Sequence, residues 1–384
     1  MKLLIIASFP SSLSSFRGPL IDAVARMGVE VHAAAPEIDS VPGLRDELVR
    51  KNVEAHEIPM QRAGMNPLRD VQTLYSLYRV MRRERPDIVL VYTIKPVIYG
   101  TLAAWLAGVP RRIAMIEGLG FVFTPNGDTP SISRRLLRLG VRSLYKLALS
   151  KAHRAIFLNP DDRAEFVDQG LLPRIKSYLL GGIGVDLAKW KPMPFLKQPV
   201  TFMLIARLLR EKGVLEFVEA ARIVKRRHPE TRFVLLGDVD PNPGSLPRQL
   251  ADAWVNEGVL EWPGHVPVIP WLAQSSVYVL PSYREGVPMS TQEAMAMGRA
   301  IITTDVPGCR ETVVEGVNGF LVPVRDAQAL AASMAKFIND PELIGRMGRE
   351  SRRLAEERFD VHKVNRRLIE LMLNYQGDSQ GIGR

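Results

Sequence analysis

Two successive runs of short apolar strands, alternating with amphipathic helical patterns, constrain the fold of this chain more than any other feature. The apolar runs of strand length are 3–7, 29–35, 87–93, 111–117, 154–159 and 176–180 in the first half, and 201–206, 233–238, 259–264, 277–282, 300–305 and 319–322 in the second. Strands that are apolar throughout, rather than at alternate positions, are typical of a parallel sheet covered by helices on both faces. The sequence therefore predicts an α/β fold of two doubly wound, Rossmann-like units.

The segment WKPMPFLKQP (190–199) separates the two runs, and its three prolines in ten residues are typical of a linker. It divides the chain into a first domain over 1–190, a linker over 191–199 and a second domain over 200–355. Helical patterns are expected at 67–84, 134–150, 212–227, 288–297, 326–338 and 341–375, and the end of the chain, 356–384, is expected to cross back to the first domain. Tandem units of this kind bind ligands in the cleft between the carboxyl ends of their strands.

Positive charge is concentrated in the first half of the chain. Of the 384 residues, which carry a net charge of +10, residues 1–198 hold 28 Lys and Arg against 18 Asp and Glu, whereas the rest hold 23 of each. This asymmetry indicates an acidic partner: membrane phosphate, nucleic acid or a phosphorylated substrate. The single cysteine, Cys309, excludes a cysteine-based zinc site, and no apolar stretch approaches the roughly 18 residues of a membrane span. A soluble or peripheral protein is therefore expected.

The segment YREGVPMSTQE (283–293) directly follows an apolar strand and opens a helix. Unpaired backbone N–H groups at a helix start favour an anion such as a diphosphate. Glu285 in the turn and Glu293 in the helix can accept hydrogen bonds from sugar hydroxyls. The alternative interpretation is a pair of surface glutamates on a capped helix.

The segment IARLLREKG (205–213) also follows a strand and opens a helix. Arg207 and Lys212 can converge on a phosphate group there, Arg207 through a bidentate contact and Lys212 as a mobile charge. Cations at a helix start are unfavourable unless they have an anion to bind, which favours the phosphate interpretation over a solvated basic surface.

Together these segments resemble the nucleotide-binding half of the family-4 retaining glycosyltransferases of the GT-B fold. The resemblance runs over roughly residues 200–325 and rests on ARLLREKG (206–213), FVLLG (233–237), GHV (264–266), PSYREG (281–286), EAMAMG (293–298) and EGVNGFL (315–321). It implies that Arg207 and Lys212 neutralise the donor diphosphate, Glu285 contacts the donor sugar and Glu293 the ribose, and backbone near Val266 reads the nucleobase. Gly286, Val287, Met289 and Ser290 would complete the donor site.

The first domain departs from that pattern in several places. Relatives often have His-Gly where this chain has Glu117-Gly118, so Glu117 either hydrogen-bonds the donor sugar or is structural. The segment SFPSSLSSFRG (8–18) replaces a Gly-rich loop, and Pro288 removes one backbone N–H from the anion site. The resemblance implies that the acceptor contacts Phe16, Arg17, Lys95 and Gly118.

These departures resemble a bacterial subgroup of the family that adds N-acetylhexosamines to undecaprenyl-diphosphate-linked sugars, among them the N-acetylgalactosaminyltransferases that act on lipid-linked bacillosamine. The segments concerned are IEGLG (116–120), GIGVD (182–186) and LLGDVDPNPG (235–244). The resemblance implies a UDP-sugar donor, a polyprenyl-diphosphate-linked acceptor, no metal or other cofactor, and a place on the inner face of the cell membrane.

Membrane contact is also suggested by the helical pattern 133–150. Its basic residues Arg134, Arg138, Arg142 and Lys146 recur every four residues beside Leu136, Leu137, Val141, Leu144 and Leu147. Such a helix either lies on an anionic bilayer or packs its apolar side on its own sheet.

Other function classes have less support. Asp238-Val239-Asp240 is interpreted as a loop rather than a metal site, and the six histidines show no pair at zinc-ligand spacing. There is no P-loop and no full G-x-G-x-x-G, and an aromatic content of 7% without a stacking motif argues against nucleic acid. A glycosyltransferase with a soluble acceptor, a UDP-sugar epimerase and a non-catalytic UDP-sugar sensor remain as alternatives.

Overall fold

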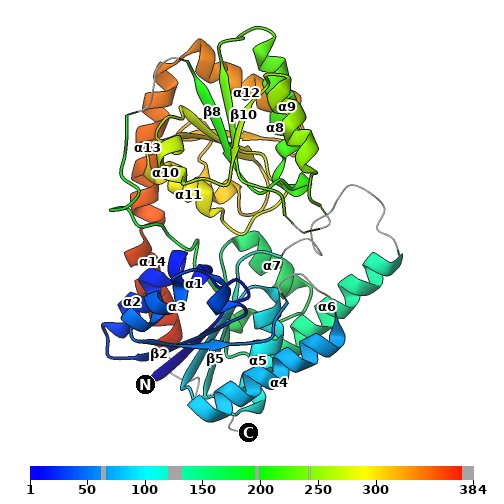
Figure 1. The fold of residues 1–384 in the computed structure, drawn as a ribbon, viewed down its shortest axis with the longest axis vertical. Helices are drawn as coiled ribbons and strands as arrows, with labels where there is room; N and C mark the ends of the chain where they lie inside the picture. The colour runs from blue at the N-terminus through cyan, green and yellow to red at the C-terminus, as the bar shows by residue number, and fades with distance from the viewer. Residues whose placement is uncertain (62–65, 120–131, 195–198, 241, 243, 374–384) are drawn as a thin grey trace. The chain divides into compact units, whose positions relative to one another are not determined.

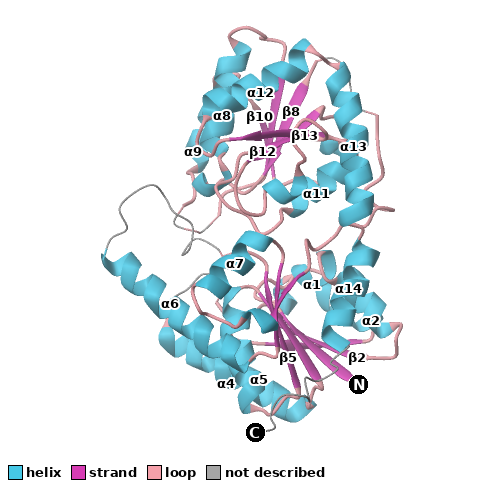
Figure 2. Ribbon diagram, turned by 180° about the vertical axis from the view of Figure 1, so that it is seen from behind, coloured by secondary structure: helices cyan, strands magenta, loops and turns pink. Residues whose placement is uncertain are grey.

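The computed structural model describes residues 1–384 except 62–65, 120–131, 195–198, 241, 243 and 374–384, and it does not describe the side chains of 132–137. The chain divides into two compact units (Figure 1). The described part of the first comprises the residues up to 183 and those from 362 onward, and the second comprises 184–361. In each unit, helices cover both faces of a parallel sheet (Figure 2).

The first unit is built on a seven-stranded parallel sheet with the order β3-β2-β1-β4-β5-β6-β7. Its strands are β1 (Lys2–Ile6), β2 (Glu30–Ala35), β3 (Val53–Glu57), β4 (Ile88–Tyr92), β5 (Arg111–Ile116), β6 (Arg154–Phe157) and β7 (Ser177–Leu179). Its α-helices are α1 (Ser12–Ser15), α2 (Gly18–Ala25), α3 (Leu44–Arg50), α4 (Pro67–Glu84), α5 (Thr101–Leu106), α6 (Ile132–Lys151), α7 (Pro160–Asp168) and α14 (Val361–Leu373). The central strands β1 and β4 are almost wholly buried, as their continuous apolar sequences require.

Strand β3 is absent from the strands expected from the sequence. Its sequence VEAHE contains three polar residues because it lies at the edge of the sheet, with Val53 and His56 buried and Glu54 and Glu57 exposed. A continuous apolar run indicates a strand that is buried on both faces, so this pattern does not indicate an edge strand such as β3.

The second unit has a six-stranded parallel sheet with the order β10-β9-β8-β11-β12-β13. Its strands are β8 (Thr201–Ile205), β9 (Arg232–Leu236), β10 (Glu261–Gly264), β11 (Val277–Leu280), β12 (Ala300–Thr304) and β13 (Gly319–Val322). Its α-helices are α8 (Val214–Lys225), α9 (Arg248–Asn256), α10 (Val268–Leu272), α11 (Met289–Ala296), α12 (Ala327–Asn339) and α13 (Glu342–Arg358).

The helical pattern 341–375 corresponds to two helices, α13 and α14, rather than the single helix expected. The chain around Val185 separates them: the Val185 N–H donates to the Phe359 carbonyl at 2.7 Å, and the Val361 N–H donates to the Val185 carbonyl at 3.1 Å. Helix α14 then packs in the first unit, where Arg111 and Arg154 donate to carbonyls of its last turn at 3.0 and 2.7 Å.

The apolar side of α6 packs mainly on its own unit. Tyr145, Ala148 and Leu149 are buried in the core, and Val141 and Leu144 pack against it. Leu147 instead is half-exposed, whereas the side chains of Arg134, Leu136 and Leu137 lie outside the described residues. Of the two alternatives considered for this helix, the described part of its apolar side therefore favours packing on its own unit over contact with a membrane.

Within the described residues, no helix combines the length and hydrophobicity that crossing a bilayer requires.

Candidate active site

The strand order of the second sheet places the predicted donor residues at one crevice. The chain leaves β8 toward β9 on one side, and β11 lies on the other side of β8. The carboxyl ends of β8 and β11 therefore flank the point where the connections diverge, which is where ligands bind in open α/β sheets. Arg207 follows β8, and Glu285 follows β11.

Lys212 and Glu285 form an ion pair across this crevice, with 2.5 Å between Lys212 Nζ and Glu285 Oε1. The same carboxylate oxygen accepts a hydrogen bond from Ser282 Oγ at 2.8 Å. The two loops approach so closely because residue 213 is glycine. Its φ is +70°, and a Cβ there would lie 2.0 Å from the Pro281 carbonyl oxygen.

Arg207 also has a carboxylate partner. Its Nη1 lies 2.5 Å from Asp240 Oδ2, and its side chain is 41% exposed whereas that of Asp240 is buried. The Asp238-Val239-Asp240 segment lies outside the helices and strands, as expected, and Asp238 pairs with Arg248 at 3.2 Å. Both predicted phosphate-binding cations are thus balanced by carboxylates, Lys212 by Glu285 after β11 and Arg207 by Asp240 after β9.

The start of α11 faces the same strand ends. Pro288 precedes the helix, and no side chain caps its first turn. The backbone N–H groups of such a turn have no partner within the helix and attract an anion. The Tyr278 hydroxyl donates a hydrogen bond to the Ser290 hydroxyl, with 2.6 Å between the two oxygens.

Gln292 is a site residue that sequence analysis missed. It is fully buried, its Nε2 donates to the Val287 carbonyl at 3.1 Å, and its Oε1 accepts from the Gly184 N–H at 3.0 Å. It therefore fixes the loop 285–288 to the helix and to the segment GIGVD. Its position beside Glu293 in a recognised motif was the signal available in the sequence.

Glu293 lies one turn into α11, and its carboxylate accepts no hydrogen bond from any described residue. Burial raises its pKa from 4.5 to about 7, and Lys189 opposes that rise. Val266 is half-buried just beyond β10, where the Gly237 N–H donates to the Gly264 carbonyl at 2.9 Å.

The first sheet has an equivalent crevice between β1 and β4. Ser8 after β1 and Thr93 after β4 meet there, with 2.7 Å between their hydroxyl oxygens. Thr93 has a φ of +67°, which is a strained conformation for a β-branched residue. Strained backbone of this kind is often found at active sites. Sequence analysis gave neither residue a role: Ser8 begins the segment 8–18 that replaces the Gly-rich loop, and Thr93 ends the apolar run 87–93.

The residues expected to bind the acceptor are distributed around this edge. Arg17 is 1% exposed, forms an ion pair with Glu117 and lies over the Tyr92 ring at 4.6 Å. Burial raises the pKa of Glu117, and Arg17 opposes the rise. Lys95 pairs with Asp70 at 2.6 Å, Phe16 is half-buried, and Gly118 has a φ of +142°.

Both units match glycosyltransferase families. Residues 6–159 match the family described as glycosyl transferase 4-like, and residues 199–340 match the family described as glycosyl transferases group 1. The chain is 29% identical to the N,N'-diacetylbacillosaminyl-diphospho-undecaprenol alpha-1,3-N-acetylgalactosaminyltransferase of Campylobacter jejuni, over 97% of this chain and 98% of that protein. This chain belongs to the family-4 glycosyltransferases.

Solved structures show the same fold. Sucrose-phosphate synthase of Thermosynechococcus elongatus superposes with a TM-score of 0.77 at 17% identity over 97% of this chain and 98% of that one. Anabaena HepE in complex with UDP gives 0.73 at 17% identity over 97% and 99%. The predicted GT-B fold and the predicted hexosyltransferase class are thereby confirmed.

The Arg17–Glu117 pair generates a prediction that separates the two roles considered for Glu117. Glu117→Gln leaves the buried Arg17 without a counter-charge and should lower the free energy of unfolding by about 3 kcal/mol, measured by urea denaturation. Adding Arg17→Met should recover most of that loss. A variant with unchanged stability and a reduced transfer rate would instead assign Glu117 to the sugar.

Glu293 generates a prediction about pH. Because its pKa is raised from 4.5 to about 7 in the folded protein, its contribution to stability is present below about pH 4.5 and is lost as the pH rises to about 7. Between pH 5 and 8, the wild-type Tm should therefore fall relative to that of Glu293→Gln. Parallel pH profiles of Tm would contradict the raised pKa.

Proposed function

We propose that this glycosyltransferase moves an N-acetylhexosamine from a UDP-sugar to an undecaprenyl-diphosphate-linked saccharide during bacterial glycan assembly. The proposal rests on the ion-paired crevice of the second unit and on two relatives similar over nearly the whole chain. One is the Campylobacter jejuni enzyme named above. The other is the UDP-Gal:alpha-D-GlcNAc-diphosphoundecaprenol alpha-1,3-galactosyltransferase of Escherichia coli, 25% identical over 93% of this chain and 96% of that protein.

The donor diphosphate would exchange the carboxylate partners of Arg207 and Lys212 for phosphate oxygens. Each cation already lies 2.5 Å from a carboxylate at the crevice, so its side chain is preorganised for an anion. Met289 and Ser290 add the start of α11 as a third positive element.

The other donor contacts follow from this placement of the diphosphate. Glu285, released from Lys212, would accept hydrogen bonds from the sugar hydroxyls, with Gly286 and Val287 beside it. Glu293 would bind the ribose, where a hydroxyl donor compensates its burial. The backbone near Val266 would contact the nucleobase.

We propose a retaining reaction that requires no metal ion. Arg207, Lys212 and the α11 amides would stabilise the charge that develops on departing UDP, the task a divalent cation performs in other enzymes. The acceptor hydroxyl would form its bond to the anomeric carbon from the side on which the bond to phosphate breaks. Its proton would pass to the leaving phosphate oxygen.

The acceptor would bind at the carboxyl edge of the first sheet, near Phe16, Lys95 and Gly118. Arg17 is buried, so it would support this edge through Glu117 and Tyr92 and leave direct contact to its neighbours. A cationic residue such as Lys95 suits a diphosphate-linked acceptor.

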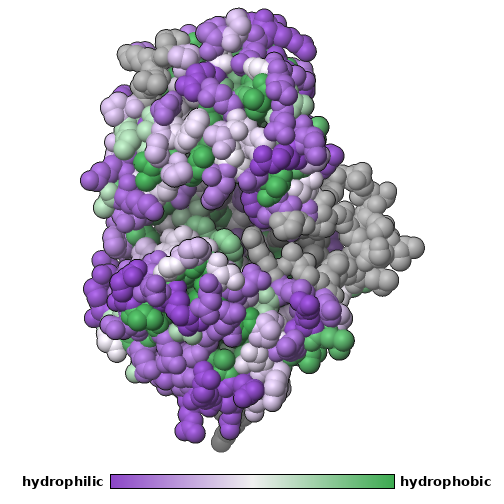
Figure 3. Space-filling view, viewed as in Figure 1, coloured by the Kyte–Doolittle hydropathy of each residue, from purple (hydrophilic) through white to green (hydrophobic). Residues whose placement is uncertain are grey.

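The first unit would also contact an anionic membrane surface, through α4 and α6. The residues Leu68, Val71 and Tyr75 recur along α4 and are 81%, 66% and 58% exposed, and Leu139 of α6 is 59% exposed. Hydrophobic residues lie beside hydrophilic ones over this side of the unit (Figure 3). Exposed apolar residues with neighbouring Arg and Lys are typical of surfaces that lie on anionic lipid.

The direct test measures UDP release from a panel of UDP-sugars in EDTA, with and without an undecaprenyl-diphosphate-linked N-acetylhexosamine in anionic vesicles. Acceptor-dependent release from UDP-GalNAc or UDP-GlcNAc is expected, with the protein sedimenting with the vesicles. Release that requires a soluble acceptor, or conversion of the donor sugar without any acceptor, would overturn the proposal.

Lys212→Ala should lower kcat by about 10²–10³-fold, because one preorganised positive group would be missing when charge develops on UDP. Lys225→Ala is the matched control, since Lys225 lies at the far end of α8 and its Nζ donates to the Gly258 carbonyl at 2.8 Å. Equal turnover of the two variants, with equal Tm, would remove Lys212 from the mechanism.

A further inference from the structure

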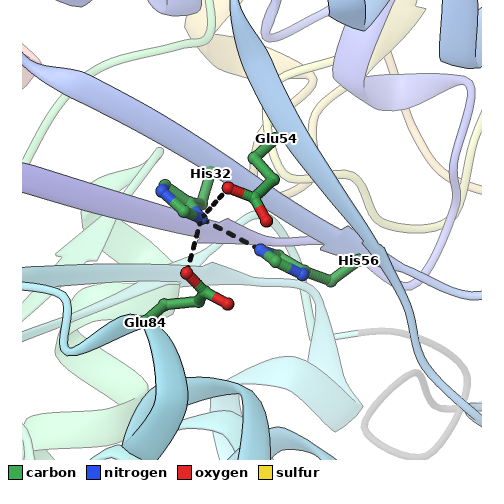
Figure 4. Close-up of side chains that lie close together, drawn as sticks. All are labelled: His32, Glu54, His56 and Glu84. Carbon is green, nitrogen blue, oxygen red and sulfur yellow. Dashed lines mark hydrogen bonds and ion pairs between the residues drawn. The ribbon is translucent and has the colours of Figure 1, made fainter.

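A cluster of two buried histidines, a largely buried glutamate and an exposed glutamate lies in the first unit on β2, β3 and the end of α4 (Figure 4). It comprises His32, Glu54, His56 and Glu84, and one ligand atom from each lies within 4.8 Å of all the others. We infer that this cluster binds a divalent transition-metal ion of the zinc type, which ties the edge strand β3 to β2 and α4.

The distances suit a tetrahedral ion. His32 Nδ1 lies 2.9 Å from His56 Nε2 and 3.8 Å from an oxygen of each glutamate. Ligand atoms about 2.0–2.2 Å from one zinc ion in a tetrahedron lie roughly 3.3–3.6 Å apart, so small side-chain shifts would complete the site. Imidazole with carboxylate is a donor set that suits zinc.

The burial of the cluster favours binding by the protein over adventitious surface contact. His32 and His56 are 1% and 6% exposed, and the Glu84 side chain is 12% exposed. Only Glu54 is open to solvent, which leaves an entry path for the ion. An ion held this way would link three elements that are far apart in the sequence.

Glu30 supplies the outer contact that metal-binding histidines commonly have. His32 Nε2 lies 2.8 Å from Glu30 Oε1, so this nitrogen carries the proton and Nδ1 presents its lone pair to the cluster. Glu30 in turn forms an ion pair with Lys2, with 3.0 Å between Glu30 Oε1 and Lys2 Nζ. The orientation of His32 is therefore already that of a ligand.

Arg83 opposes binding at the second histidine. Its Nη2 lies 3.0 Å from His56 Nδ1, and a guanidinium can only donate. His56 Nδ1 therefore accepts, and the proton on Nε2 is donated to His32 Nδ1. When the ion binds, that proton moves from Nε2 to Nδ1 and Arg83 swings away, which its 66% exposed side chain permits. Arg83 thus lowers the affinity for the metal.

The cluster is separate from the predicted sugar site. Glu84 ends α4, immediately before β4 begins, and therefore lies at the amino ends of the strands. Phe16, Lys95 and Gly118 follow the carboxyl ends. The role of the ion is therefore structural, and its test does not depend on transfer activity.

The experiment titrates untagged, chelator-treated full-length protein with Zn²⁺ against a chromophoric chelator. Wild type should bind one equivalent, and His56→Gln and Glu84→Gln should lose it. His228→Gln should retain it, since His228 lies in the second unit. Glu30→Gln should weaken binding about 10–100-fold, and Arg83→Ala should tighten it.

Two further measurements distinguish loss of the metal site from misfolding of a variant that alters a buried residue. Glu54→Gln alters an exposed side chain, so it should fold normally and still bind Zn²⁺ more weakly. Zn²⁺ should raise the Tm of wild type and of His228→Gln while leaving that of His56→Gln unchanged. Absence of a stoichiometric site in wild type, or equal affinity in wild type, Glu84→Gln and Glu54→Gln, would overturn the inference.

Discussion

The arrangement of this protein depends on one constraint: parallel strands can be joined only by crossovers that return to the same end of the sheet. All strand carboxyl ends therefore meet at one edge, and the order of the strands decides which loops become neighbours. In the second sheet, β8 and β11 are adjacent, so the loops that contain Arg207 and Glu285 are neighbours although the two residues are 78 positions apart in the sequence. The Lys212–Glu285 ion pair follows from that adjacency, and the Arg207–Asp240 pair follows from the adjacency of β8 and β9.

The ion pairs in turn explain how the site can be both cationic and stable. Two basic side chains facing an empty crevice would repel each other and destabilise the unit. Glu285 and Asp240 neutralise them at 2.5 Å, and each carboxylate is largely buried. In the proposed reaction a diphosphate would replace these existing partners, so its binding would depend on the difference between two sets of interactions rather than on the new contacts alone.

The sequence was sufficient for the parts of the molecule whose residues repeat with a clear period or match a known motif. Strands such as β4 (IVLVY) are buried on both faces and are therefore recognisable in the sequence as continuous apolar runs. Edge strand β3 and the break between α13 and α14 at Phe359 depend on the segments that pack beside them. A single sequence does not show which segments those are. Arg207 and Lys212 were identifiable from spacing, but their carboxylate partners lie 33 and 73 residues away. Gln292 stands in a recognised motif, but its contacts with Val287 and Gly184 are visible only in the structure, as is the contact of Thr93 with Ser8.

The sequence of β3 has a consequence for the protein's behaviour at high concentration. An edge strand offers unpaired backbone groups to any other strand, and this is a common route to aggregation. Glu54 and Glu57 place exposed charges on both faces of β3. A second molecule that added a strand at this edge would have to bring its own side chains against these carboxylates. The polar residues that interrupt the apolar pattern of β3 therefore also protect the edge from self-association.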